Sequence, residues 1–175
     1  MATPRHWGFN QLTARTAQRL VADARLPTGA LVLDIGAGLG AITGPLVDAG
    51  VRVIAVELHP GRAALLEDRF AGRIIVARTD AADLRLPRRP FHVVANPPYG
   101  ITTALMRRLL HPGSRLVTAH LVLPDWAVHR WTGPNAPGAQ RWSRTFHVSS
   151  GWPISRHEFR PAPRTGSRLL VIRRR

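Results

Sequence analysis

One stretch of the chain reads Leu31-Val32-Leu33-Asp34-Ile35-Gly36-Ala37-Gly38-Leu39-Gly40, and it decides the fold class. Its first five residues form an apolar run typical of a buried strand, and its glycines predict a tight loop directly behind that strand. Glycine has no Cβ, so the backbone of such a loop can approach a ligand closely. The N-terminus of a following helix favours a ligand carboxylate. The stretch therefore predicts a strand, a cofactor-binding loop and a helix.

Apolar, β-rich runs alternate with segments of helical period along the rest of the chain. This alternation is typical of a parallel sheet covered by helices on both faces. We expect strands at Leu31–Ile35, Arg52–Glu57, Arg73–Ala77, His92–Ala95, Arg115–Leu123, Thr145–Ser150 and Arg168–Arg173. We expect helices at Thr13–Ala24, Ala41–Ala49, Gly61–Phe70, Ile101–Leu110 and Pro124–Trp131, and an exposed loop at Gly133–Gly138 that orders only on binding.

The last two expected strands are joined by a proline-rich loop, Gly151–Ser167, with no helix. Without a crossover helix the two strands pair antiparallel. A parallel sheet closed by an antiparallel hairpin is the arrangement of class I, Rossmann-like, S-adenosylmethionine-dependent methyltransferases, whereas a dinucleotide-binding fold continues strand, helix, strand. The expected fold class is therefore α/β with this seven-stranded sheet, in a single catalytic domain spanning residues 1–175.

Charge and composition narrow the possible partners. The formal net charge is +15, and all 25 Lys and Arg residues are Arg. Such a surface favours polyanions as partners. We find no apolar run long enough for a membrane span and no signal-peptide pattern, so we expect a cytoplasmic protein that does not bind membranes. The absence of Cys excludes disulfides, thiolate nucleophiles and Cys-based metal sites.

The motif Asn96-Pro97-Pro98-Tyr99 follows the strand-like run that ends at Ala95. A conjugated amine such as adenine N6 is a poor nucleophile, because its lone pair is delocalised into the ring. The Asn96 side-chain oxygen and the Pro97 carbonyl can accept its two N–H bonds, and the Tyr99 ring can stack on the base. The motif beside a cofactor loop thus indicates methyl transfer to such an amine.

Two acidic residues are expected to complete the cofactor site. Glu57 ends the second expected strand, where a carboxylate takes ribose hydroxyls. Asp80 follows the third strand, where its carboxylate can accept the amine of a cofactor adenine, although Asp83 competes for this role and a helix cap or turn former is the structural alternative. The His residues show no metal-binding spacing, and methyl transfer from a sulfonium needs no metal.

Several classes of protein remain open on these residues. A protein glutamine N-methyltransferase uses the same four-residue motif, because an amide nitrogen is also conjugated. A DNA adenine methyltransferase shares it but usually adds a sizeable target-recognition region. A dinucleotide oxidoreductase explains the glycines and Glu57 but leaves Asn96 without a task. A silent RNA-binding protein explains only the charge.

A set of six motifs, in order along nearly the whole chain, resembles the Erm family of 23S rRNA adenine N6-methyltransferases. The motifs are Gly8-Phe9-Asn10-Gln11-Leu12, Asp34 to Gly40, Val56-Glu57, Asp80-Ala81, Val94 to Gly100, and Phe159-Arg160-Pro161-Ala162-Pro163 through Ser167. The small-subunit rRNA adenine dimethyltransferases share ancestry with this family, so the 16S substrate stays an alternative.

The resemblance implies a role for each matching residue. S-adenosylmethionine would be bound by Asn10, Leu12, Gly36, Gly38, Glu57, Leu58, Asp80, Ala81 and Asn96. Asn96 and Pro97 would orient the target amine, Tyr99 would stack on the target adenine, and Phe159 would cover its other face. The resemblance also implies resistance to macrolide, lincosamide and streptogramin B antibiotics.

Two departures from the family pattern affect these expectations. The first motif commonly begins Gln-Asn-Phe-Leu in the family, whereas here Phe9 and Gln11 are exchanged around Asn10. Most members also carry a helical C-terminal lobe, which we do not expect here.

Without that lobe, we expect arginines of the catalytic domain to bind the RNA. Candidates are Arg5 with His6 and Trp7, Arg88 with Arg89, Arg107 with Arg108, the Arg130–Arg144 region, Arg160, Arg164 and Arg173–Arg175. We expect a monomer that acts on rRNA before ribosome assembly is complete.

Overall fold

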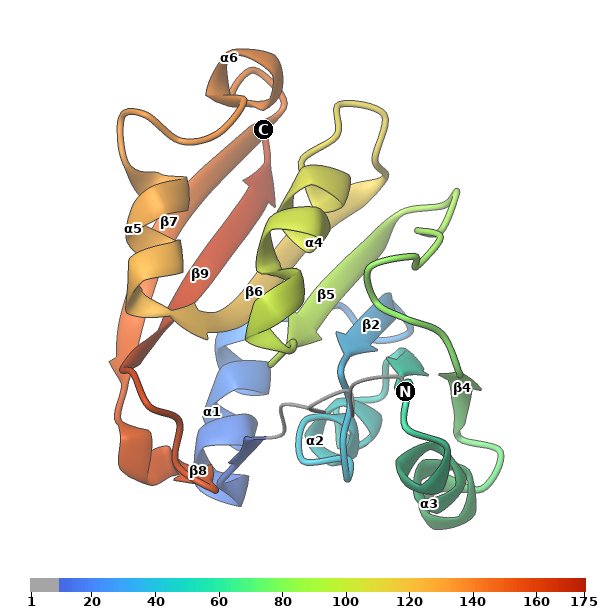
Figure 1. Ribbon diagram of the computed structural model, residues 1–175. Coiled ribbons are helices and arrows are strands. Elements are labelled where there is room, and N and C mark those ends of the chain that lie inside the picture. Colours follow the sequence, from blue (N-terminus) through green and yellow to red (C-terminus); the bar gives the residue numbers. More distant parts are fainter. Residues whose placement is uncertain (1–9) are drawn as a thin grey trace, which may run out of the picture.

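The computed structural model describes residues 10–175, so the motif residues Gly8 and Phe9 and the candidate RNA contacts Arg5, His6 and Trp7 lie outside the described residues. Its main feature is a seven-stranded sheet with the order β4-β3-β2-β5-β6-β9-β7 (Figure 1). The strands are β2 (Leu31–Ile35), β3 (Arg52–Val56), β4 (Ile74–Ala77), β5 (Phe91–Ala95), β6 (Leu116–Pro124), β7 (Phe146–Ile154) and β9 (Ser167–Arg174).

Helices cover both faces of the sheet, as the alternating pattern predicts. They are α1 (Ala14–Ala24), α2 (Thr43–Asp48), α3 (Pro60–Phe70), α4 (Thr102–Leu109), α5 (Asp125–Thr132) and the short α6 (Ala139–Trp142). Buried side chains of α4 and α5 pack in one apolar core, and those of α1 and α2 pack in a second core on the other face. Figure 1 shows α4 and α5 in front of the sheet and α1 behind it.

The antiparallel closure of the sheet is confirmed. Strands β2, β3, β4, β5 and β6 are parallel, whereas β9 runs antiparallel to both of its neighbours. Leu121 of β6 pairs with Leu170 of β9, and Ser150 of β7 pairs with the same Leu170 from the other side. The last strand therefore lies inside the sheet, between β6 and β7.

A second, two-stranded sheet was not predicted. Strand β1 (Gln11–Leu12) pairs antiparallel with β8 (Phe159–Arg160), which follows the short 3₁₀ helix η2 (Arg156–Glu158). Glu158 Oε2 accepts hydrogen bonds from the hydroxyls of Thr13, at 2.7 Å, and Thr16, at 2.5 Å. These bonds attach the loop between β7 and β9 to the first turn of α1, and so place the segment around residue 10 beside the sheet.

The segment Gly133–Gly138 is a loop, as expected, and Pro134, Asn135 and Gly138 in it are exposed. Ala136 is buried in the core beneath α5, and Trp142 in the following α6 is buried and donates its indole N–H to the Pro137 carbonyl at 2.9 Å. These two apolar residues, which lie at either side of the glycine at position 138, attach the end of the loop to the core, and ordering of the loop on binding stays a prediction.

Candidate cofactor and substrate site

A cavity of about 460 Å³ opens at the carboxyl ends of the parallel strands. Its walls come from β1, the loops after β2, β3 and β4, and the loop after β5 that leads into the 3₁₀ helix η1 (Tyr99–Ile101). This edge of an open α/β sheet, outside the carboxyl ends of its strands, is where such folds bind ligands. The lining includes eleven residues singled out in the sequence: Asn10, Leu12, Gly36, Gly38, Glu57, Leu58, Asp80, Ala81, Asn96, Pro97 and Tyr99.

The glycine loop packs directly against the Asn96-Pro97-Pro98-Tyr99 loop. Gly36 has a φ of +77°, and a Cβ at this position would lie 2.8 Å from Pro98 Cδ and 3.5 Å from the Asn96 carbonyl oxygen. The backbone N–H groups of Gly36 and Ala37 both donate to the Val56 carbonyl, at 2.8 and 3.1 Å. Only glycine fits position 36, because both the left-handed backbone and the close approach of the second loop exclude a side chain.

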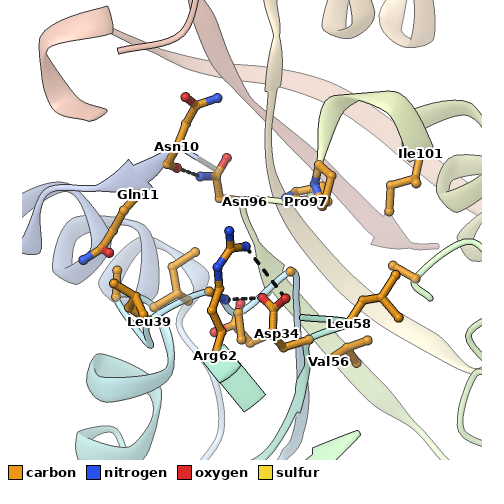
Figure 2. A pocket seen from close by; sticks show the side chains of 18 of the residues that line it. Asn10, Gln11, Asp34, Leu39, Val56, Leu58, Arg62, Asn96, Pro97 and Ile101 are labelled. Atoms are coloured by element: carbon orange, nitrogen blue, oxygen red, sulfur yellow. Dashed lines mark hydrogen bonds and ion pairs between the residues drawn. The ribbon is translucent and has the colours of Figure 1, made fainter. Parts of the chain in front are cut away.

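Glu57 is buried at the bottom of the cavity wall and is fixed by backbone donors. Its Oε2 accepts from the Gly38 N–H at 2.9 Å, and its Oε1 accepts from the His59 N–H at 2.8 Å. Arg62 from α3 also lines the cavity (Figure 2). Its Nη1 lies 3.8 Å from Glu57 Oε1. The carboxylate is therefore held rigidly at the end of β3, and Arg62 is a cavity residue that the sequence patterns did not single out.

The structure separates the two aspartates that competed for a role in the sequence. Asp80 lines the cavity, and its Oδ1 accepts from the Ala82 N–H at 2.9 Å. Asp83 lies outside the cavity lining with its side chain 84% exposed, near Arg108. One oxygen of the Asp80 carboxylate thus stabilises a turn, which is the structural role considered as an alternative for this residue. The other oxygen has no hydrogen-bond partner among residues 10–175.

Asp34 is the cavity residue with the most strongly perturbed carboxyl group. It is the fourth residue of β2, is 1% exposed, and its Oδ2 accepts from the Thr43 hydroxyl at 2.7 Å. Its Oδ1 is buried without a hydrogen-bond partner in the described part of the chain. Burial raises the pKa of Asp34 from 3.8 to about 7, against the opposing effect of the Thr43 hydrogen bond. An aspartate within an otherwise apolar strand was the sequence signal for this residue, but it was assigned no role.

This buried carboxyl makes the stability of the protein depend on pH. Its folded-state pKa lies above the ordinary value, so the protonated form favours folding, and stability falls as pH rises from about 4 through about 7. We compare the free energy of unfolding of Asp34→Asn with that of wild type, each measured by urea unfolding. We expect the advantage of the variant to be about 2 kcal/mol larger at pH 8 than at pH 5. The matched control is Asp48→Asn, at the exposed end of α2. An Asp34→Asn stability gain that is the same at both pH values would contradict the perturbed carboxyl.

Asn96 is oriented by the segment at residue 10. Its Nδ2 donates to the Asn10 carbonyl oxygen at 2.7 Å, and Figure 2 shows the two side by side at the cavity wall. This donation uses the amide nitrogen and leaves the Asn96 side-chain oxygen as an acceptor. The first motif and the fifth motif, whose residues Asn10 and Asn96 lie 86 residues apart in sequence, are thus joined by one hydrogen bond.

Tyr99 and Phe159, the two aromatic residues expected to hold the base, lie in different environments. Tyr99 lines the cavity, and its hydroxyl is hydrogen-bonded to the Ser167 hydroxyl at 2.7 Å. Burial raises the pKa of Tyr99, so the hydroxyl stays protonated. Phe159 is 0% exposed, pairs with Leu12 across the small sheet and does not line the cavity. In this arrangement its ring offers no face to a base, because the unpredicted pairing of β1 and β8 covers it.

The fold and the site define a class I methyltransferase: a seven-stranded sheet with an inserted antiparallel strand, a glycine loop at a ligand cavity, and an Asn-Pro-Pro-Tyr motif in the cavity wall. Comparison with known proteins supplies the family. The family model described as "Ribosomal RNA adenine dimethylase" matches residues 5–150, and the chain belongs to this family. The expected fold class and the expected cofactor, S-adenosylmethionine, are thereby confirmed.

Individual relatives carry more specific names. The chain is 32% identical over 95% of its length to an "rRNA adenine N-6-methyltransferase" of Corynebacterium diphtheriae, covering 67% of that protein. It is 31% identical over 93% of its length to "Ribosomal RNA small subunit methyltransferase A" of Leifsonia xyli, covering 63%. The crystal structure of the 23S rRNA methyltransferase ErmE matches with a TM-score of 0.82 and 30% identity, covering 95% of this chain and 70% of that one. The chain spans about half to two thirds of the length of the curated relatives it matches.

Across residues 10–175, no helix is both long enough and apolar enough to cross a membrane. In the same residues, no three His, Asp or Glu side chains are grouped so that they could hold a metal ion.

Proposed function

We propose that this protein transfers a methyl group from S-adenosylmethionine to N6 of an adenosine in ribosomal RNA, with 23S rRNA as the favoured substrate. The observation that carries the proposal is the orientation of Asn96: its amide nitrogen is occupied by the Asn10 carbonyl, and its amide oxygen remains as an acceptor beside the glycine-loop cavity. An acceptor fixed in this way suits an exocyclic amine, which presents N–H donors.

The described residues fit the cofactor. The cavity volume of about 460 Å³ falls in the range of small-molecule sites, and its carboxylates suit a cofactor with an ammonium group, ribose hydroxyls and an adenine amine. Asp34, with an unpartnered buried oxygen, would take a cationic donor, Glu57 would accept ribose hydroxyls, and Asp80 would accept the adenine amine through its second oxygen. Gly36 and Gly38 would let the backbone approach the methionine part, and Leu12, Leu58 and Ala81 would contact the cofactor from the cavity wall.

The cofactor supplies a methyl group on a sulfonium, which is already an activated leaving group. The protein then has to position the amine and accept its N–H bonds as its lone pair leaves the conjugated ring. Asn96 Oδ1 and the Pro97 carbonyl would do this, and the Tyr99 ring would stack on the base while its hydroxyl is held by Ser167. The methylated amine is acidic and loses its proton to water, so no dedicated general base is needed.

The choice of ribosomal subunit rests on the relatives. The resemblance to the Erm family and the match to ErmE, a 23S rRNA methyltransferase, favour the large subunit and with it resistance to macrolide, lincosamide and streptogramin B antibiotics. The similarity to a small-subunit methyltransferase supports 16S rRNA as the second candidate. Because the target base must be turned out of its stack to enter the cavity, protein-free RNA or an assembly intermediate is the proposed substrate.

The test is transfer of labelled methyl from S-adenosylmethionine to protein-free 23S rRNA, 16S rRNA and a release-factor protein in parallel, followed by nucleoside analysis. We expect N6-methylated adenosine in 23S rRNA alone. Label only in 16S rRNA would move the activity to the second candidate. Label only in the protein would show that the motif serves a glutamine amide, and absence of label in all three despite cofactor binding would refute the proposed function.

A further inference from the structure

A second cavity, of about 570 Å³, lies at the edge of the sheet opposite the cofactor cavity. It is formed by the loop before β5, the C-terminal end of α4 and the loop before β6. Strands β5 and β6 are parallel, so these segments meet at the amino ends of the strands, whereas the cofactor cavity lies at their carboxyl ends. In Figure 1 this edge is at the top, where α4 ends and β6 begins.

The lining of this cavity combines a basic rim with an apolar floor. The rim carries Arg88, Arg107, Arg108, His111 and Arg115, and the floor carries Leu84, Leu86 and Pro87. Leu84 is buried, and Leu86 and Pro87 are half-buried. Four arginines converging on one hollow repel one another unless an anion lies between them.

One of the four arginines, Arg108, binds neighbouring residues and so helps to form the cavity. The side chains of the other three have no partner among the described residues, and we call these arginines uncommitted. Arg108 donates from Nη1 to the Leu84 carbonyl at 2.9 Å and lies 4.0 Å from the exposed Asp83 carboxylate, so it fixes the loop before β5 against α4. In residues 10–175, the side chains of Arg88, Arg107 and Arg115 are exposed and make no hydrogen bond or ion pair.

The loop before β6 is fixed by an arginine from the last strand. Arg174 of β9 donates to the carbonyl oxygens of Leu116, at 2.9 Å, and Ser114. Its guanidinium also lies 4.9 Å from the centre of the Phe146 ring. The position of the Arg115 backbone is therefore set by β9, and the hollow is a built feature and not a gap between mobile loops.

We propose that this arginine-rimmed cavity binds the phosphodiester backbone of the RNA substrate, at a point separate from the methylation site. The proposal rests on the proposed function, which makes RNA the substrate. Guanidinium groups bind phosphate through paired N–H donors, and the apolar floor accommodates the sugar between two phosphates. The two cavities lie at opposite ends of strand β5, whose five residues span about 17 Å. The protein therefore holds one stretch of RNA in the arginine-rimmed cavity while a base from another stretch enters the cofactor cavity.

The experiment measures the affinity of the full chain for protein-free 23S rRNA over a range of salt concentrations, together with its affinity for S-adenosylmethionine. The variant replaces the three uncommitted arginines: Arg88→Gln, Arg107→Gln and Arg115→Gln. We expect RNA affinity to fall on the order of tenfold and the slope of log affinity against log salt to decrease by roughly 2 to 3, since each phosphate contact contributes close to one unit. Cofactor affinity is expected to stay within twofold of wild type, which also reports that the variant is folded.

Two controls make the result specific. The triple variant Arg15→Gln, Arg52→Gln and Arg73→Gln removes the same charge from exposed positions on α1, β3 and the segment before β4. A loss of RNA affinity equal to that of the cavity variant would overturn the proposal, because overall charge alone would explain it. Lysine at the three cavity positions should retain most of the salt-dependent binding, because attraction to phosphate follows charge.

The outcomes separate this proposal from the proposed function. If wild type methylates 23S rRNA and the cavity variant binds and methylates it equally well, the phosphate site is refuted and the function stands. If wild type binds RNA without methylating it and the cavity variant loses that binding, the function is refuted and the phosphate site stands.

Discussion

Asn96→Ala is expected to abolish methyl transfer, by a factor of at least about 10², while the affinity for S-adenosylmethionine stays within a few-fold of wild type. The substitution removes the side-chain oxygen that we assign as acceptor for the target amine, and loss of one such preorganised group costs about 10² to 10³ in rate. It also releases the hydrogen bond to the Asn10 carbonyl, which is 2.7 Å in the structure. Single-turnover methyl transfer and equilibrium binding of the cofactor measure the two effects separately.

The matched control for this prediction is Gln11→Ala, which also removes an amide from the cavity lining. Gln11 lies in β1, next to the Asn10 that binds Asn96, but we assign Gln11 no contact with the target amine. The control should therefore retain turnover. Wild-type turnover in Asn96→Ala, or equal losses in the two variants, would refute the role of Asn96.

Gly36→Ala is expected to remove both cofactor binding and methyl transfer. The new Cβ would lie 2.8 Å from Pro98 Cδ, so the loop that carries Asn96 and Tyr99 has to move away from the glycine loop. The left-handed backbone, with φ of +77°, adds a cost of about 1 to 2 kcal/mol for any residue with a Cβ. The variant should show a lower unfolding midpoint in urea and no measurable binding of S-adenosylmethionine by calorimetry.

Gly29→Ala separates the two causes. Gly29 has nearly the same φ, +75°, but a Cβ there meets nothing within 4 Å. It should show the backbone cost in stability and bind cofactor normally. If both glycine variants bind cofactor like wild type, the contact between the two loops is not needed for the site.

The elements of the main sheet were predictable because each strand carries its own local pattern. The apolar run of residues 31–35, its glycines and the missing crossover helix before the last strand gave the fold class, and the structure and the family match confirm it. The expected strand at Thr145–Ser150 is longer in the structure, where β7 continues to Ile154. Pro153, which suggested a loop, follows an irregularity in the register between β7 and β9.

The parts that were missed depend on contacts between distant segments. The two-residue strands β1 and β8 have no periodicity of their own, and only their mutual pairing defines them. That pairing buries Phe159, which resemblance alone placed on the base. Arg62 enters the cavity from α3 because Glu57 attracts it, and Asp34 gains its raised pKa from burial under elements that lie later in the chain. Such environments are properties of the assembled fold and leave little trace in a local pattern.

The position of β9 between β6 and β7 also constrains the order in which the chain can fold during translation. Within the main sheet, β7 has β9 as its sole neighbour, so residues 146–154 have no strand to pair with until residues 167–174 have left the ribosome. Until then, β6 and β7 expose unpaired edges, which are prone to association with other chains. Late synthesis of one interior strand therefore makes the nascent protein a candidate for chaperone binding, and translation arrested before residue 167 should yield an aggregation-prone chain.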